Sequence, residues 1–347
     1  MLRYSRMMAM RRFTIQAYCA KLKATRIFPL AKKVVEVEVV RQVFICASYQ
    51  GKQMPNTRPL SHQQPRRLRN IRCAYCNAEF TEPSEPEKEH VIGRNFVPKG
   101  THNQQWNLHV NSCHICNERK SKLENDLSAI TLYPDPGQEE VDSLRWSAAE
   151  RKSKTYSQRT GKPVADSIEE VKLSGRLGLA EVTFSFSSKP QFDENRAFEL
   201  AGFQLRGFFF LLTYDAEQQM GNSWPGYYMP IGALPINDWG NPLVLSFANY
   251  VKDWDMRFTA VRLAQGFFGV VIKKHPTEAL WSWALEWNKS TRLFGFLGDR
   301  AKAQEIVDAL EVPQQSSWIE QPEGNKTRYR EEVPLPSDSD DLFLFAP

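Results

Sequence analysis

The chain has 347 residues and a formal net charge of +5, and 41% of its residues are hydrophobic and 12% aromatic. This length and composition can bury a substantial core, which excludes an intrinsically disordered protein and favours more than one domain. No apolar run approaches the ~20 residues of a membrane-spanning helix, so we expect a soluble, cytoplasmic, bacterial-type protein without a membrane partner.

The first fifth of the chain is strongly basic. Residues 1–72 carry 16 Lys/Arg against two Glu, which leaves 29 Lys/Arg against 38 Asp/Glu in the rest. Such an arm suits nucleic acid or an anionic surface, and a solvated tail is the simpler interpretation. Residues 1–70 fit a partly flexible arm, an organelle presequence, or the upstream extension of a product that starts at Met54. Valine and glutamate alternate within residues 34–40, a pattern that is typical of a strand.

Four of the six cysteines form two pairs, Cys73-Ala-Tyr-Cys76 and Cys113-His-Ile-Cys116, with 36 residues between them. This spacing is typical of a tetrahedral zinc site in which each pair supplies two sulfurs from one tight turn. Because four protein sulfurs leave no open position for water or substrate, we expect a structural Zn²⁺. The same pattern indicates a reducing compartment and not a disulfide framework.

The sequence around these pairs predicts two strands followed by a helix. Strands are expected at 89–92 and 107–110, after a loop at 81–88 that is rich in Pro and Glu. Leu123, Leu127 and Ile130 recur at helical spacing, which predicts an amphipathic helix that starts near Cys116 and ends at about Tyr133. The predicted local structure is therefore a ββα unit.

Polar residues of this unit have the chemistry that phosphodiester hydrolysis needs. His90 offers a neutral imidazole as a base near pH 7, and Glu89 and Asn117 offer hard oxygen ligands for Mg²⁺ or another divalent cation. Asn107 can hydrogen-bond across the loop or to His90, where it would fix the orientation and tautomer of the imidazole. Adjacent strand residues point to opposite faces, so we expect Glu89 at the frayed beginning of its strand, where it can share a site with His90.

These residues occur in a familiar order. Glu89-His90, Asn107-Leu108 and Cys113-x-x-Cys116-Asn117-x-x-Lys120 make residues 71–131 resemble the HNH endonucleases, a family of ββα-metal nucleases. The resemblance implies a metal-dependent enzyme that cuts DNA, or alternatively RNA.

The resemblance also implies roles for single residues. His90 would be the general base, Glu89 and Asn117 the ligands of the catalytic ion, and Asn107 the residue that organises the site. The chain has Glu89 where Asp is common, Gly93 where proline is common, and Asn117 at the position of the second His, which leaves the preferred metal open.

Basic residues near the proposed site are expected to contact phosphates without sequence preference. They are Arg94, Arg119, Lys120 and Lys122. His109 could support the site and His114 could serve as a metal ligand, although a structural role is the simpler interpretation of both. The alternative function is a non-catalytic four-cysteine zinc module that binds nucleic acid or protein.

Beyond this module the sequence predicts structure more than function. We expect a linker at 134–175 with a helical piece at 147–152, an α+β domain of unknown role at 176–320, and a disordered tail at 321–347. The expected elements are a strand at 182–187, a helix from Glu194 to about Gln218, strands at 227–231, 243–247, 256–261 and 267–272, and a helix from Pro276 that carries Trp281, Trp283 and Trp287.

The predicted fold class is α+β. It consists of a zinc-pinned ββα-metal (HNH) module at 71–133, followed by a separate α+β domain with an aromatic-rich core.

Overall fold

The structure is a computed structural model that describes most of the chain from Arg66 onward. The described residues are 66–80, 85–102, 106–134, 141–167, 169–177, 180–188, 192–222, 226–312, 317–320, 326–329, 332–336 and 339–343. Only the backbone is described for 169–177, 180–188, 260–262, 317–320 and 326–329. The basic arm before Arg66, with the strand predicted at 34–40, lies outside these ranges.

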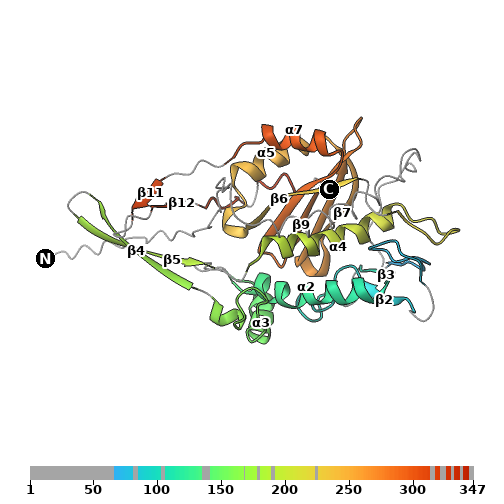
Figure 1. Cartoon of the computed structure of the whole chain (residues 1–347), viewed down its shortest axis with the longest axis horizontal. Coiled ribbons are helices and arrows are strands. Elements are labelled where there is room, and N and C mark those ends of the chain that lie inside the picture. Colours follow the sequence, from blue (N-terminus) through green and yellow to red (C-terminus); the bar gives the residue numbers. More distant parts are fainter. Residues whose placement is uncertain are drawn as a thin grey trace, which may run out of the picture.

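The N-terminal part is a small sheet followed by a long helix (Figure 1). Strand β2 (Glu87–His90) pairs antiparallel with β3 (Leu108–Ser112), and β1 (Arg66–Arg67) pairs parallel with the other edge of β3. Helix α2 (His114–Leu132) follows directly, so the predicted order of two strands and a helix is confirmed. Strand β2 begins two residues earlier than expected, at Glu87.

The C-terminal part is a five-stranded antiparallel sheet between helices. Its strand order is β6-β10-β9-β8-β7. Figure 1 shows α5 and α7 on one side of this sheet and α4 on the other, with α2 beyond α4. The strands and helices are β6 (Tyr227–Pro235), β7 (Asp255–Arg262), β8 (Phe268–Lys274), β9 (Leu280–Trp287), β10 (Thr291–Gly298), α4 (Glu194–Leu212), α5 (Pro242–Val251) and α7 (Arg300–Ala309).

Shorter elements complete the chain, and the mixture of helices and sheets confirms the α+β class. They are α3 (Ser143–Lys152), η1 (Val164–Ser167), the hairpin of β4 (Glu169–Leu177) and β5 (Ala180–Ser188), η2 (Ile236–Asp238), α6 (Leu263–Gly266), and the pair β11 (Ser317–Glu320) and β12 (Lys326–Tyr329). Among the described residues, no helix combines the length and apolar character that crossing a membrane would require.

Two predicted elements have the wrong type. The strand predicted at 243–247 is helix α5, which Asn241 caps by accepting a hydrogen bond from the Leu243 amide at 2.9 Å and which Pro242 starts. The helix predicted after Pro276 is strand β9, whose odd-numbered residues, including Trp281, Trp283 and Trp287, share one face of the sheet. In both cases a run of apolar residues is compatible with a helix and with a strand. The secondary structure is then determined by local capping, as in α5, or by pairing with neighbouring strands, as in β9.

The two parts share one core, which contradicts the prediction of a separate C-terminal domain. The Tyr75 ring packs edge-on against Phe203 of α4 with centroids 5.3 Å apart, and Phe96 packs against Trp287 of β9 at 5.1 Å. The Asn288 amide donates to the Phe96 carbonyl at 3.1 Å. The ββα unit is thus held by the larger sheet as well as by its own residues.

Part of the segment predicted to be a disordered tail packs on the sheet. Leu342 and Phe343 are buried in the cluster that α5 and α7 cover. Arg292 donates to Asp340 at 3.1 Å and lies over the Phe343 ring, with its guanidinium carbon 4.8 Å from the ring centroid. These contacts fix residues 340–343 against β10.

Candidate functional site

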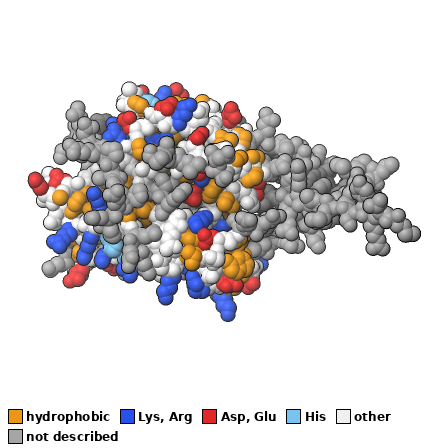
Figure 2. Space-filling view, turned by 180° about the vertical axis from the view of Figure 1, so that it is seen from behind, with side chains coloured by type: hydrophobic (Ala, Val, Ile, Leu, Met, Phe, Trp, Pro, Cys, Tyr) orange, Lys and Arg blue, Asp and Glu red, His pale blue; other side chains and the backbone are white. Residues whose placement is uncertain are grey.

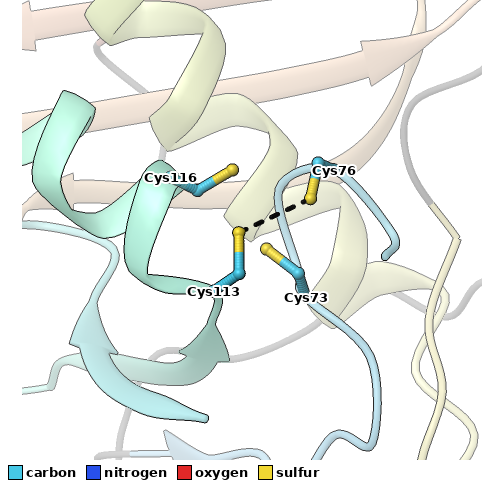
Figure 3. Close-up of side chains that lie close together, drawn as sticks. All are labelled: Cys73, Cys76, Cys113 and Cys116. Atoms are coloured by element: carbon cyan, nitrogen blue, oxygen red, sulfur yellow. Dashed lines mark hydrogen bonds between the residues drawn. The ribbon is translucent and has the colours of Figure 1, made fainter. Parts of the chain in front are cut away.

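The four paired cysteines form one compact cluster. Figure 3 shows their sulfurs pointing toward one another, two from the turn after β1 and two from the start of α2. All four Sγ atoms lie within 4.8 Å of one another, and the Sγ atoms of Cys76 and Cys113 are 3.8 Å apart. A tetrahedral ion with metal–sulfur bonds of ~2.3 Å needs sulfurs ~3.8 Å apart, so the cluster is positioned to bind a metal ion such as zinc.

Local backbone structure brings the two pairs together. Asn77 has a left-handed φ of 61°, and its amide donates to the Cys73 carbonyl at 2.8 Å, which closes the first turn. Cys113 is the N-cap residue of α2, so the second pair occupies the first helical turn. The Asn70 side chain accepts from the Asn111 amide at 2.8 Å and donates to the Asn111 carbonyl at 2.7 Å, which ties the first turn to β3.

The thiols perturb one another strongly. Hydrogen bonds with Cys116 and Cys76 lower the pKa of Cys73 to about 2, whereas the hydrogen bond with Cys73 raises the pKa of Cys116. The sulfurs are thus close enough to interact strongly, and a bound divalent cation would stabilise all four as thiolates.

A cleft of about 380 Å³ lies between the end of β2 and helix α2. Three of the four predicted catalytic and Mg²⁺-binding residues line it together, namely Glu89, His90 and Asn117. Glu89 and His90 are the last two residues of β2, so they meet at the end of the strand and not at its beginning as predicted. Further lining residues are Gly93, Arg94, Asn95, Ser121, Lys122, Glu124 and Asn125.

Glu89 is anchored by a buried lysine. The Lys120 ammonium is fully buried and donates to Glu89 and to Glu124, at 2.6 Å in each case, and to the His90 carbonyl at 2.9 Å. The predicted contact of Lys120 with a phosphate is therefore wrong, because a side chain without exposed surface cannot reach a substrate backbone. Its charge instead fixes the carboxylate that lines the cleft.

A glycine makes room for this ion pair. The Gly93 amide donates to Glu124 at 3.0 Å, and a Cβ atom at position 93 would lie 2.2 Å from a Glu124 oxygen. A proline could neither donate this hydrogen bond nor fit the space. The departure of Gly93 from the common pattern thus has a local structural reason.

Asn117 is oriented by a carboxylate that sequence reasoning missed. The Asn117 Nδ2 atom donates to Glu87 at 2.5 Å, and the other Glu87 oxygen contacts His114 Nδ1 at 2.7 Å. Hydrogen bonds with Asn117 and then His114 lower the pKa of Glu87, and Glu87 in turn raises the pKa of the exposed His114. His114 therefore faces Glu87, and the metal-holding cluster contains cysteines alone. The spacing in the sequence could have indicated Glu87, because it lies two residues before Glu89 and therefore on the same face of the strand.

His90 is neutral and already hydrogen-bonded. Burial, followed by the neighbouring His109 and Arg94, lowers the pKa of His90 to about 3. Arg94 Nε donates to His90 Nε2 at 2.9 Å, which places the remaining ring proton on Nδ1. The imidazole is thus uncharged near pH 7, and its Nε2 atom is occupied by the hydrogen bond from Arg94.

Asn107 does not fill its predicted role. It is absent from the residues that line the cleft, and its buried Oδ1 has no hydrogen-bond partner among the described residues. The imidazole orientation that was assigned to Asn107 comes instead from Arg94.

The other predicted phosphate contacts lie on the surface. Lys122 lines the cleft and pairs with Glu118 at 2.7 Å along the same helix. Arg119 pairs with Glu199 of α4 and is not part of the cleft lining. Arg94 and Lys122 are therefore the two predicted basic contacts that the cleft includes.

Comparison with protein-family models, curated proteins and solved structures finds no match for the chain. Among the described residues, the four cysteines are the single group of three or more His, Cys, Asp or Glu side chains placed to hold a metal ion. The function is therefore inferred from the chemistry of the cleft and the cysteine cluster.

Proposed function

We propose that the protein is a metal-dependent endonuclease of the HNH type that hydrolyses phosphodiester bonds in DNA. The observation that carries this proposal is the convergence of Glu89, His90 and Asn117 on one cleft beside the cysteine cluster. In this assignment the four thiolates hold a structural Zn²⁺, and the cleft binds a second divalent cation such as Mg²⁺.

The oxygen donors of the cleft suit a hard cation with several retained waters. Glu89 offers a carboxylate, and Asn117 offers its Oδ1 because its Nδ2 is engaged by Glu87. Two carboxylates and one ammonium give the group of Glu89, Glu124 and Lys120 a net charge of minus one when all three are ionised. That residual negative charge favours a cation at the open side of Glu89.

His90 supplies the base. Its neutral ring can accept the proton of an attacking water once Arg94 releases Nε2, and the Arg94 guanidinium is then free to contact a phosphate oxygen. A bound divalent cation would supply charge neutralisation at the phosphate and the leaving oxygen. Lys120 and Glu87 hold the donor groups in place without touching the substrate.

A second candidate is a non-catalytic zinc module that binds nucleic acid. It is favoured by two contacts in the cleft, because Arg94 occupies the base nitrogen of His90 and Lys120 neutralises part of Glu89. A module that only binds DNA would keep these contacts when DNA is present.

Nicking of supercoiled plasmid by the full-length, zinc-loaded chain separates the two candidates. We expect nicking that requires added Mg²⁺ or Mn²⁺, and a Glu89→Gln variant that needs a higher cation concentration for half-maximal rate. Glu118→Gln is the matched control, since Glu118 is an exposed residue of α2 outside the cleft lining. Binding of DNA without nicking in any of these metals would establish the non-catalytic module and refute the nuclease.

A further inference from the structure

The four clustered cysteines differ in their access to solvent. Cys73 and Cys116 are buried, whereas Cys76 is exposed and Cys113 is half-buried. Cys76 belongs to the first turn and Cys113 is the N-cap residue of α2, so the two more accessible cysteines come from different halves of the cluster. Their Sγ atoms are 3.8 Å apart and are joined by the dashed line in Figure 3. We call Cys76 and Cys113 the accessible pair.

The start of α2, which carries Cys113, lies at the surface of the molecule. Ile115, the residue before Cys116, is 75% exposed, and His114 beside it is also exposed. Figure 2 shows Lys and Arg side chains along the lower edge of the molecule, over the part that contains β2, β3, α2 and α3. A small polar reagent in solution can therefore reach Cys76 without a change in fold.

An accessible thiolate next to a second one can be oxidised by a peroxide. A sulfur that ligates zinc is deprotonated, and the thiolate is the nucleophilic form of cysteine. Attack of the Cys76 sulfur on hydrogen peroxide forms an S–O bond, breaks the O–O bond and releases hydroxide, which leaves a sulfenic acid. Attack of the Cys113 thiolate on that sulfur forms an S–S bond, breaks the S–O bond and releases a second hydroxide. Two thiolates are thereby oxidised to one disulfide, and the two peroxide oxygens are reduced to hydroxide.

This disulfide would dismantle the metal site. A sulfur in a disulfide is no longer a thiolate, so Cys73 and Cys116 would be the remaining thiolate ligands of the cluster. A disulfide also needs its sulfurs about 2 Å apart, so the accessible pair must close from 3.8 Å and leave the tetrahedral arrangement. The loss of two ligands and of this geometry releases the ion.

The polypeptide around the cluster is held by contacts that do not involve the metal. The Ala74 amide donates to the Asn111 carbonyl at 3.1 Å, and the Asn70 side chain bonds to the same backbone. The Tyr75 ring packs against Phe203 of α4. These contacts keep the first turn on β3 and α4 when the ion has left, and the disulfide links that turn to α2. The oxidised chain thus stays folded, and reduction can restore the ligands.

The cluster is coupled to the cleft through the first turn of α2. Asn117, which lines the cleft, donates its backbone amide to the Cys113 carbonyl at 3.0 Å. Its side chain donates to Glu87 of β2 at 2.5 Å. A change at Cys113 therefore acts on the turn that positions Asn117.

We propose that the cysteine cluster is a peroxide-sensitive switch, in which a disulfide of the accessible pair releases zinc and displaces Asn117 from its position in the cleft. The effect on hydrolysis rests on the proposed nuclease. The release of zinc and the identity of the disulfide do not depend on any activity of the cleft, so the two proposals can fail separately.

Treatment of the full-length, zinc-loaded chain with a small molar excess of hydrogen peroxide tests the switch. A chromogenic chelator measures released zinc, and mass spectrometry of peptides, after alkylation of free thiols, identifies the disulfide. We expect release of about one zinc ion per chain and a cross-link between Cys76 and Cys113. Plasmid nicking should fall by about tenfold or more, and it should return after reduction with dithiothreitol and addition of zinc.

Two variants separate the accessible pair from other cysteines. Cys76→His keeps four donors, because zinc also binds Cys₃His sites, and it removes the exposed thiolate. Once its zinc content and Tm have been measured, this variant should release zinc about tenfold more slowly or not at all. The double change Cys19→Ser with Cys46→Ser is the control, since both residues lie before Arg66 and outside the described residues. The control should release zinc at the wild-type rate.

Retention of zinc by the wild-type chain would overturn the switch. A cross-link within Cys73–Cys76 or within Cys113–Cys116, or one that involves Cys19 or Cys46, would also overturn it. An unchanged nicking rate in the cross-linked chain would overturn the coupling to the cleft. Zinc release with the expected cross-link, in a chain that nicks no plasmid before oxidation, would support the oxidation step and refute the nuclease.

Discussion

Replacing Lys120 with methionine removes the cation from a buried group of two carboxylates. The ammonium is fully buried and donates to Glu89 and Glu124 at 2.6 Å each, while methionine keeps the length and apolar stem of the side chain. Removing one partner of a buried ion pair costs about 3–5 kcal/mol, because the remaining charge is left uncompensated. We therefore expect a loss of that size in the free energy of unfolding, and a fall in Tm of roughly 10 °C.

The pH dependence of this loss follows from Glu124. Burial raises the pKa of Glu124 above 4.5, and the charge of Lys120 opposes that rise. Without Lys120 the pKa in the folded state lies further above that of the unfolded chain, so the folded variant binds a proton that the unfolded chain has released. The destabilisation should be smallest in acid and grow as the pH rises from 4.5 toward neutrality.

Denaturant unfolding of zinc-loaded protein at pH 5 and pH 8 measures both effects. Lys122→Met is the matched control, because Lys122 lies on the same helix, is 72% exposed and pairs with Glu118 on the surface. That control should lose less than about 1 kcal/mol. Equal stability of Lys120→Met and Lys122→Met at pH 8 would refute the assignment of Lys120 as the buried anchor of Glu89.

Three further predictions concern the metal cluster and the groups around it. Cys73→Ser or Cys116→Ser should lower zinc content and Tm together, as read by metal analysis and calorimetry, because metal binding contributes to the folding free energy of such sites; full zinc content in either variant would contradict the four-thiolate assignment. Arg94→Ala should raise the pKa of His90 above about 3, since it removes a positive charge and a donor to the neutral ring; an NMR titration that shows no rise would refute this contact. Glu87→Ala should cost less than about 1 kcal/mol in stability because its pair with His114 is on the surface, yet it should slow nicking by releasing Asn117; an unchanged rate would remove Glu87 from the site.

Short-range patterns predicted that the four cysteines cluster and that Glu89, His90 and Asn117 lie together, because these contacts are local or set by secondary structure. The spacing of Cys73, Cys76, Cys113 and Cys116 anticipated a cluster whose sulfurs lie within 4.8 Å of one another. A strand end beside the start of a helix likewise brings Glu89, His90 and Asn117 to one cleft. Both arrangements are set by short local segments, namely the two cysteine turns and the end of β2 beside the start of α2.

The roles of single polar residues were harder to predict, because burial depends on tertiary packing. Lys120 was expected to contact a phosphate, although it lies four residues after Cys116 and three before Leu123 on the buried stripe of α2, with Glu124 one turn further on. That position within an apolar stripe was a readable signal for a buried ion pair. Nothing in the local sequence indicated that Asn107 would lie outside the cleft.

The larger sheet was predicted only in part for a related reason. Strand β7 alternates between apolar and polar residues, whereas β9 is buried on both faces, so Leu280 and Ala284 face one core and Trp281 and Trp283 face the other. A strand with two buried faces has no polar alternation to distinguish it from a buried helix. The shared core with the ββα unit depends on contacts such as Phe96 with Trp287, which are distant in sequence.

Hydrolysis at the cleft is tested most directly by the plasmid nicking rate of His90→Ala against wild type, with zinc-loaded full-length protein and saturating Mg²⁺. His275→Ala is the matched control, because His275 lies beside Trp254, away from the cleft. Loss of the general base should slow nicking by about 10²- to 10⁴-fold while Tm and zinc content stay at the wild-type values. Nicking by His90→Ala at the wild-type rate would contradict the assignment of His90 as the base.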